Sequence, residues 1–210
     1  MSLPLQSIDV LRQEHDAILS VLDQLEQAVA LAQDGVLVPA DIFTDIQEFM
    51  SVFVTQCHNH KENEAVFGRL DDDLAGQVLA NRLKQEHQEA LAVDRDFAAA
   101  VAAYVPGDIA SARRLAGATE RYADDLRQHI TTETDELFPL MARDLSGSDR
   151  DMIAEFDRVE TDEIGEGVHE RLHAMIDGLP ERIAACRRPA GSGVAAATGK
   201  QSSAALLHER

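Results

Sequence analysis

Apolar residues recur at alternating steps of three and four along four stretches of the chain, a spacing that places them on one face of an α-helix. No stretch competes with a strand-like alternation of apolar and polar residues. Four long helices joined by short loops predict an all-α fold, the up-down-up-down four-helix bundle. The expected helices run from about Ser7 to Gly35, from about Ala40 to Arg69, from the acidic residues 71–73 to Val105, and onward from Asp108.

The chain beyond this bundle has a different composition. Residues 149–163 and 168–185 follow helical patterns with fewer apolar positions, which predicts an appended C-terminal helical pair. We expect this pair to pack on the outside of the bundle or to form a homo-oligomer interface. From Arg187 the chain is rich in Gly, Ala and Ser and predicts a flexible tail. The expected division is a bundle at 1–145, appended helices at 146–186 and a tail at 187–210.

Composition and charge narrow the expected partners. The chain has 210 residues, of which 45% are hydrophobic, so it can bury a substantial core. A net charge of -19 repels nucleic acid and anionic lipid, so neither nucleic acid nor a membrane is an expected partner. No secretory signal or membrane-spanning run is evident, and Cys57 and Cys186 are isolated. These features predict a cytoplasmic protein, in which Cys57 is a packed thiol.

Each predicted helix has an apolar stripe, the row of apolar residues on one face. Histidines and glutamates interrupt these apolar stripes at regular positions. His58 is followed four residues later by Glu62, and His129 is followed four residues later by Glu133. Residues four apart lie one above the other on a helix, so each pair can reach one point in space. A lone histidine lies on each of the other two stripes, at positions 15 and 87.

These residues belong to an internal repeat. Gln13-Glu14-His15 recurs 72 residues later as Gln85-Glu86-His87, and the His-x-x-x-Glu motif recurs after 71 residues. A single histidine on an apolar stripe is commonly a hydrogen-bonded core residue, but a buried carboxylate is costly without a cation or donors. Four imidazoles and two carboxylates suit a pair of first-row transition ions, with the carboxylates bridging them. The predicted ligands are His15, His58, Glu62, His87, His129 and Glu133.

Other polar residues have weaker claims to a role. His169 and His173 lie four apart in the appended region, where they could bind a metal or belong to a solvated helix face. His60 has no histidine at its equivalent position in the repeat, so it is left out of the site. Tyr122 shares a helix face with His129 and could be a hydrogen-bond donor, a pocket wall or a core residue. Asp94 could orient a ligand imidazole.

The ligand pattern resembles that of the hemerythrin-like family, the HHE cation-binding domains. The resemblance covers about residues 7–143 and implies a four-helix bundle that holds two iron ions in an oxo- or hydroxo-bridged non-haem centre. The motifs that carry it are Glu14-His15, His58 with Glu62 and Val66-Phe67, Glu86-His87, and His129 with Glu133 and Leu137-Phe138-Pro139.

Within that family, four histidines and two glutamates resemble the set in bacterial proteins of the repair-of-iron-centres group. Worm oxygen carriers use five histidines, one Glu and one Asp, so reversible oxygen carriage is not expected here. Because the two hairpins contribute equal ligand sets, the two irons are expected to be nearly equivalent. The leading functional expectation is the binding or sensing of a small ligand, O2, NO or peroxide. The alternatives are an enzyme of the nitrosative or oxidative stress response (NO or peroxide reduction, iron-centre repair), or iron storage or sensing.

Overall fold

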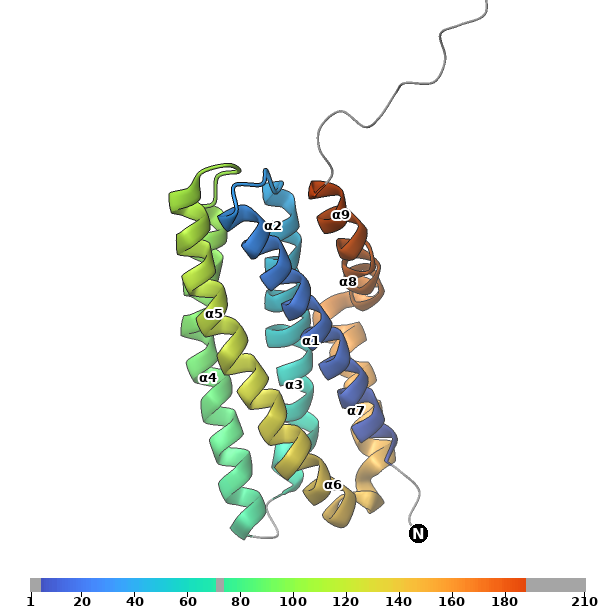
Figure 1. The fold of residues 1–210 in the computed structure, drawn as a ribbon. Helices are drawn as coiled ribbons and strands as arrows, with labels where there is room; N and C mark the ends of the chain where they lie inside the picture. Colours follow the sequence, from blue (N-terminus) through green and yellow to red (C-terminus); the bar gives the residue numbers. More distant parts are fainter. Residues whose placement is uncertain (1–4, 71–73, 188–210) are drawn as a thin grey trace, which may run out of the picture.

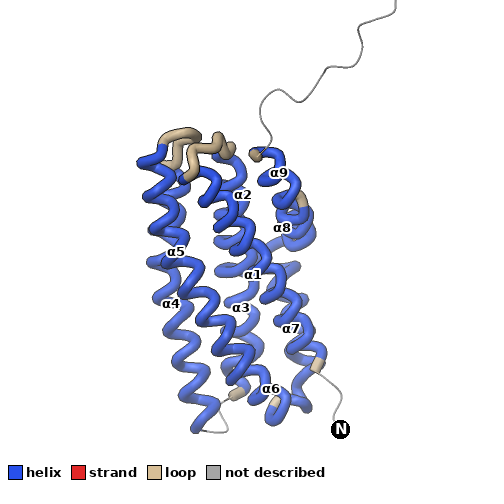
Figure 2. Tube along the Cα trace, in the orientation of Figure 1, coloured by secondary structure: helices blue, strands red, loops and turns tan. Residues whose placement is uncertain are grey.

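The computed structural model describes residues 5–70 and 74–187, and within these ranges the chain forms helices and no strand (Figure 2). The helices of the bundle run alternately up and down beside one another (Figure 1), so the predicted all-α bundle is confirmed. The expected helix start at residues 71–73 and residues 188–210 of the tail predicted at 187–210 lie outside the described ranges. The bundle consists of α1 (Gln6–Gln33), α2 (Ala40–Phe49) continued by α3 (Asn59–Lys61), α4 (Leu74–Ala102), and α5 (Ile109–Thr132) continued by α6 (Phe138–Asp144).

The bundle has four helical rods: α1, α2 with α3, α4, and α5 with α6. Two of these rods, the second and the fourth, change locally from α to π geometry. The segments η1 (Met50–His58) and η2 (Glu62–Val66) flank α3, and η4 (Glu133–Leu137) joins α5 to α6. In a π turn each N–H bonds the carbonyl five residues back, which widens the helix and rotates the following side chains about its axis. The sequence predicted uninterrupted helices here. Each of these three π segments begins or ends at a predicted ligand, so the irregular turns help to aim those side chains.

Of the three helix starts predicted from capping residues, Ser7, 71–73 and Asp108, the two that lie in the described ranges have different outcomes. Asp108 caps α5 as predicted, because its carboxylate accepts hydrogen bonds from the backbone N–H groups of Ala110 and Ser111 at 3.1 Å. The prediction for Ser7 was wrong, because Ser7 lies inside the first turn of α1. Asp149, at the start of α7, accepts the backbone N–H groups of Gln6 and Ser7 at 3.0 Å instead. A distant segment therefore caps α1.

The appended segment packs along α1 and α2, on the outside of the bundle (Figure 1). The helix expected at 168–185 is broken at Gly178, because Pro180 in the first turn of α9 has no N–H to continue α8. Leu172, Leu179 and Ile183 pack into the core of the bundle, so this segment shares that core. The segment comprises η5 (Ser146–Ser148), α7 (Asp149–Arg158), η6 (Val159–Gly165), α8 (Val168–Asp177) and α9 (Leu179–Cys186).

Two apolar clusters fill the core, one on each side of a polar layer. The larger cluster includes Phe49, Phe53 and Phe97, and the smaller includes Phe67 and Phe138. Between them, along every rod, lie the predicted ligands. Among the described residues, no helix is both long and apolar enough to cross a bilayer. The fold thus places the six predicted ligands between two apolar clusters, where little water can solvate them.

Candidate metal centre

Each of the four helical rods contributes to one cluster of buried polar side chains. His15 comes from α1, His58 ends η1, His87 comes from α4 and His129 comes from α5. The first residue of η2 and the first residue of η4 are the two glutamates. The structure therefore brings all six predicted residues together, and none is more than 9% exposed: His15, His58, Glu62, His87, His129 and Glu133.

The possible ligand atoms form two groups of four that share both glutamates. One group contains His15 and His58 and the other contains His87 and His129, and within each group the ligand atoms lie within 4.8 Å of one another. Glu62 presents Oε1 to His58 at 3.8 Å and Oε2 to His87 at 3.5 Å. Glu133 presents Oε2 to His15 at 3.1 Å and Oε1 to His129 at 2.9 Å. Each carboxylate thus offers one oxygen to each group, as a bridging ligand would.

The four carboxylate oxygens of Glu62 and Glu133 are buried, and none accepts a hydrogen bond of acceptable geometry. The neighbouring imidazole nitrogens come as close as 2.9 Å, but at angles outside hydrogen-bond geometry. A buried carboxylate without donors costs several kcal/mol, which cations placed between the ligand atoms would offset. By their own chemistry, the residues present fit two metal ions.

Two further glutamates orient two of the four histidines. The Nδ1 atom of His58 lies 2.8 Å from Oε2 of Glu14, and Nδ1 of His129 lies 2.7 Å from Oε2 of Glu86. A carboxylate at Nδ1 favours the proton there, which leaves the lone pair of Nε2 facing the centre. This role was not among the sequence predictions. The signal was available, because the Gln-Glu-His repeat places a glutamate at the same position in both hairpins.

Charges inside the metal-free cluster are strongly coupled. Burial alone would lower the pKa of His129, but Glu133 and Glu86 outweigh burial and raise the pKa to about 10. The pKa of His58 is also raised, because Glu62 and Glu14 outweigh its burial. The pKa of the Glu133 carboxyl lies below its usual range, because the nearby His129 and His15 outweigh burial. Without metal, the cluster therefore favours a protonated His129 beside the Glu133 carboxylate, and a metal ion that binds there must displace that proton.

Comparison with known proteins agrees with this geometry. The model of the hemerythrin family, described as the hemerythrin HHE cation binding domain, matches residues 6–141. The chain belongs to this family. No curated protein and no solved structure matches the chain significantly. The family description supports cation binding in general, and all six clustered side chains of this hemerythrin-family chain lie within the matched range.

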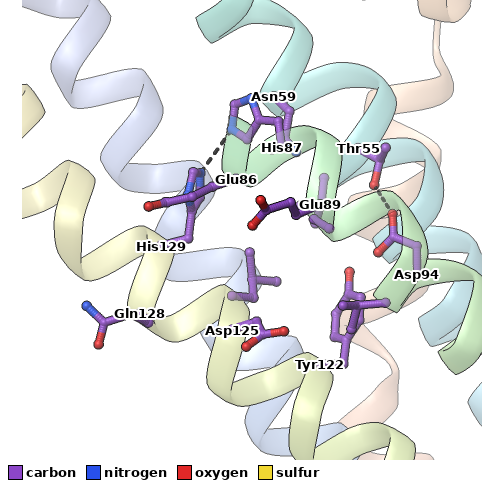
Figure 3. Close-up of a pocket in the computed structure, with 14 residues that line it drawn as sticks. Thr55, Asn59, Glu86, His87, Glu89, Asp94, Tyr122, Asp125, Gln128 and His129 are labelled. Carbon is purple, nitrogen blue, oxygen red and sulfur yellow. Dashed lines mark hydrogen bonds and ion pairs between the residues drawn. The ribbon is translucent and has the colours of Figure 1, made fainter. Parts of the chain in front are cut away.

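A cavity of about 260 Å³ reaches this hemerythrin-family centre from one side (Figure 3). His87 and His129 line it, whereas His15 and His58 are not among its lining residues. Glu89 and Asp125 are exposed at the mouth of the cavity, and the buried ring of Tyr122 forms part of its wall. The two halves of the centre therefore differ in their access to solvent, although their ligand types are the same.

Tyr122 and Asp94 have related roles at the cavity wall (Figure 3). The Tyr122 ring stacks on Phe97 at 5.0 Å, and the Asp94 carboxylate is close enough to help raise the pKa of the Tyr122 hydroxyl. Asp94 also accepts a hydrogen bond from Oγ1 of Thr55 at 2.7 Å. The prediction that Asp94 orients a ligand imidazole was wrong, because Glu14 and Glu86 occupy that position. Burial raises the pKa of both Asp94 and Tyr122.

The other candidate residues lie outside the cluster. His60 forms a partly exposed pair with Glu163, which agrees with its omission from the predicted ligands. The His169 ring stacks on Phe53 at 5.0 Å and the His173 ring meets Phe53 edge-on at 5.2 Å. Both imidazoles are thus partly buried, and the solvated-face interpretation was wrong for them. His169 also places Nδ1 3.5 Å from Oε2 of Glu160, in a group with Glu14 that could hold a metal ion. Cys57 is a buried thiol, as predicted, and burial raises its pKa to about 12.

Proposed function

We propose that this protein holds two iron ions and uses them to bind or sense a small ligand such as O2, NO or peroxide. The observation that carries the proposal is the bridging arrangement, in which Glu62 and Glu133 each offer one oxygen to each pair of histidines. His15 and His58 would hold one ion, and His87 and His129 the other. A mixed set of imidazoles and carboxylates suits first-row transition ions. Bound iron would supply an open coordination position and one-electron redox chemistry.

The cavity supports a choice among small ligands. Its inner wall includes the apolar side chains of Val54, Val93 and Leu126, which dissolve neutral molecules readily. Its mouth carries Glu89 and Asp125, whose negative potential opposes the entry of anions. Neutral O2, NO and H2O2 would therefore reach the position between His87 and His129 more easily than azide, nitrite or superoxide.

Metal content tests the two-ion part of the proposal. Protein produced with iron should contain about two irons per chain, as expected of two ligand sets, measured by elemental analysis against protein concentration. Glu133→Ala should lose iron because it removes one oxygen from each set. Asp135→Ala is the matched control, since Asp135 is an exposed carboxylate in the same π segment. A fully loaded protein with one mononuclear site would overturn the proposal.

Optical spectra test the ligand part. Anaerobic ferrous protein should change its spectrum when one equivalent of O2, NO or H2O2 is added, and glutamate-bridged iron is the expected chromophore. Consumption of many equivalents with a suitable reductant would assign the protein to the enzymatic alternative, whereas stoichiometric binding supports a binder or sensor. A spectrum that none of the three ligands alters would refute a small-ligand function.

A further inference from the structure

Lys61 has a fully buried side chain at the junction between the bundle and the appended segment. Lysine is almost never fully buried unless its charge is paired. Its ammonium group bonds two carboxylates, Oε1 of Glu14 in α1 and Oε1 of Glu160 in η6. The position between these carboxylates is thus already occupied by a cation, the amino group of the chain itself.

Glu14 extends this pairing to the candidate metal centre. While Oε1 of Glu14 accepts from Lys61, Oε2 lies 2.8 Å from Nδ1 of His58. Glu14 is only 4% exposed, so its position depends on these two partners. Removing the negative charge of Glu160 would free the ammonium group of Lys61 to move and would weaken its bond to Glu14. Because Glu14 contacts Nδ1 of His58, the orientation of the His58 ring would then change. A continuous chain of charged groups therefore runs from Glu160 through Lys61 and Glu14 to His58.

The other half of the centre is built differently. Glu86, which orients His129, is held by Arg82 of its own helix at 2.9 Å, and Arg82 is 47% exposed. The repeat position equivalent to Lys61 is Thr132, which carries no charge. The appended segment therefore contributes a carboxylate to the charged chain of one half only, and Glu160 lies beyond the family match, which ends at residue 141.

We propose that Glu160 is a positioning residue for the metal position formed by His15 and His58, acting through Lys61 and Glu14. Docking of residues 149–186 and metal occupancy at this position are then coupled, so that each strengthens the other. The position formed by His87 and His129 is independent of this coupling. This inference rests on the two-ion proposal above, and the test below separates the two.

Stepwise anaerobic titration of the metal-free full-length chain with Co²⁺ tests the inference, with calorimetry and visible absorption as readouts. The unaltered protein should bind two ions. Glu160→Gln should bind one ion normally and the other with roughly tenfold or greater loss of affinity, the scale typical of outer-shell changes. Glu160→Asp, which keeps the charge but shortens the side chain, should give a smaller loss. Glu163→Gln is the matched control, because Glu163 lies in the same π segment and pairs with His60 and Arg158 at the surface.

A spectroscopic readout identifies which position changes. In the Co²⁺ protein, the ring N–H protons of His58 and His129 should give separate paramagnetically shifted NMR signals, assigned with the variants Glu14→Gln and Glu86→Gln. Glu160→Gln should shift or broaden only the His58 signal. A merely structural role for Glu160 would leave that signal in place.

A docking control completes the design. Arg182→Ala loosens α9 by removing the bonds of Arg182 to Asp45 and Asp41 on α2, while it leaves Lys61 and Glu160 intact. Because docking and occupancy are coupled, Arg182→Ala should also lose affinity, but less than Glu160→Gln, since it keeps the carboxylate of Glu160 on Lys61. Equal loss in the two variants would overturn the positioning role of Glu160, because loosened docking without loss of the carboxylate would then explain the whole effect. Two ions bound normally in Glu160→Gln would overturn this inference alone. Fewer than two in the unaltered protein would overturn the two-ion proposal together with it.

Discussion

Removing the metal should destabilise the fold substantially, because the centre buries two carboxylates whose oxygens have no hydrogen-bond donors. Glu62 and Glu133 are 0% exposed, and their ligand oxygens lie within 4.8 Å of each other. At an effective dielectric constant of about 20, two charges at that distance repel by roughly 3 kcal/mol. In the metal-free protein, a protonated His129 offsets part of this repulsion. Metal ions replace that proton and add coordination bonds.

The expected size of the effect follows from binding linkage. Free metal at a thousandfold excess over Kd stabilises a folded protein by about 4 kcal/mol per ion. For a chain of this length each kcal/mol raises Tm by about 2–4 °C. One ion should therefore raise Tm by about 8–16 °C, and a second ion should raise it further. Calorimetric melting of chelated and iron-loaded protein, under anaerobic conditions, measures the difference.

The pH dependence of this difference has a definite sign. The pKa of His129 is raised in the folded metal-free protein to about 10, from an ordinary 6.5. Its contribution to metal-free stability is therefore complete below about pH 6.5 and is lost as the pH rises towards 10. Over the same range fewer protons compete with the metal, and affinity should rise by up to about tenfold per pH unit for each proton displaced. The gap between the two melting temperatures should widen as the pH increases.

Glu62→Gln is the matched variant for this experiment. In the metal-free form the amide removes the repulsion between Glu62 and Glu133 and also removes the attraction between Glu62 and His58, two changes of opposite sign. The metal-dependent rise in Tm should nevertheless be largely lost, because a neutral side-chain amide at this position would not bridge two ions. Equal melting temperatures with and without metal in the unaltered protein would refute the reasoning, as would a gap that is independent of pH.

The remaining predictions concern access to the centre and the orientation of its ligands. Ala90→Phe should fill part of the cavity and slow NO binding without changing the iron content, as stopped-flow absorption and elemental analysis would show; unchanged rates would mean that ligands enter elsewhere. The double variant Glu89→Gln with Asp125→Asn should speed azide binding about tenfold at low salt but leave NO binding unaffected, and an equal effect on both would contradict electrostatic exclusion at the mouth. Glu86→Gln should weaken the ion at His87 and His129 by roughly tenfold to a hundredfold in a Co²⁺ titration, and full affinity would show that Glu86 does not orient His129.

Periodicity and repetition carried the prediction of the bundle and of the six clustered residues. A buried glutamate on an apolar stripe is a strong signal, because the cost of burying it demands a partner. The spacing of apolar residues did not predict the π segments that begin at Glu62 and Glu133. Over a single turn, α and π geometry place the same residues on the inner face of the helix. That detail depends on tertiary packing around the centre.

Roles that depend on partners far along the chain were beyond the sequence. The spacing of Asp94 from His87 suggested that it orients an imidazole, but Thr55 and Tyr122 engage its carboxylate. Asp149 caps α1 across 142 residues, a pairing that no local pattern indicates. The pairing of Lys61 with Glu160 is of the same kind. Local signals identify the residue types that need partners, and only the packed structure identifies those partners.

The difference between the two halves of the centre bears directly on function. Equal ligand sets predicted nearly equivalent irons, and the ligand types are indeed equal. Their surroundings differ, because the half formed by His15 and His58 is linked to the appended segment through Glu14, while the half formed by His87 and His129 lines the cavity. Coordination chemistry depends on outer contacts and solvent access as well as on ligand identity. On the two-ion proposal, exogenous ligands therefore approach the cavity-side position, and the enclosed position anchors the bridging carboxylates. The two halves thus have the same ligand types, but only the half formed by His87 and His129 lines the cavity.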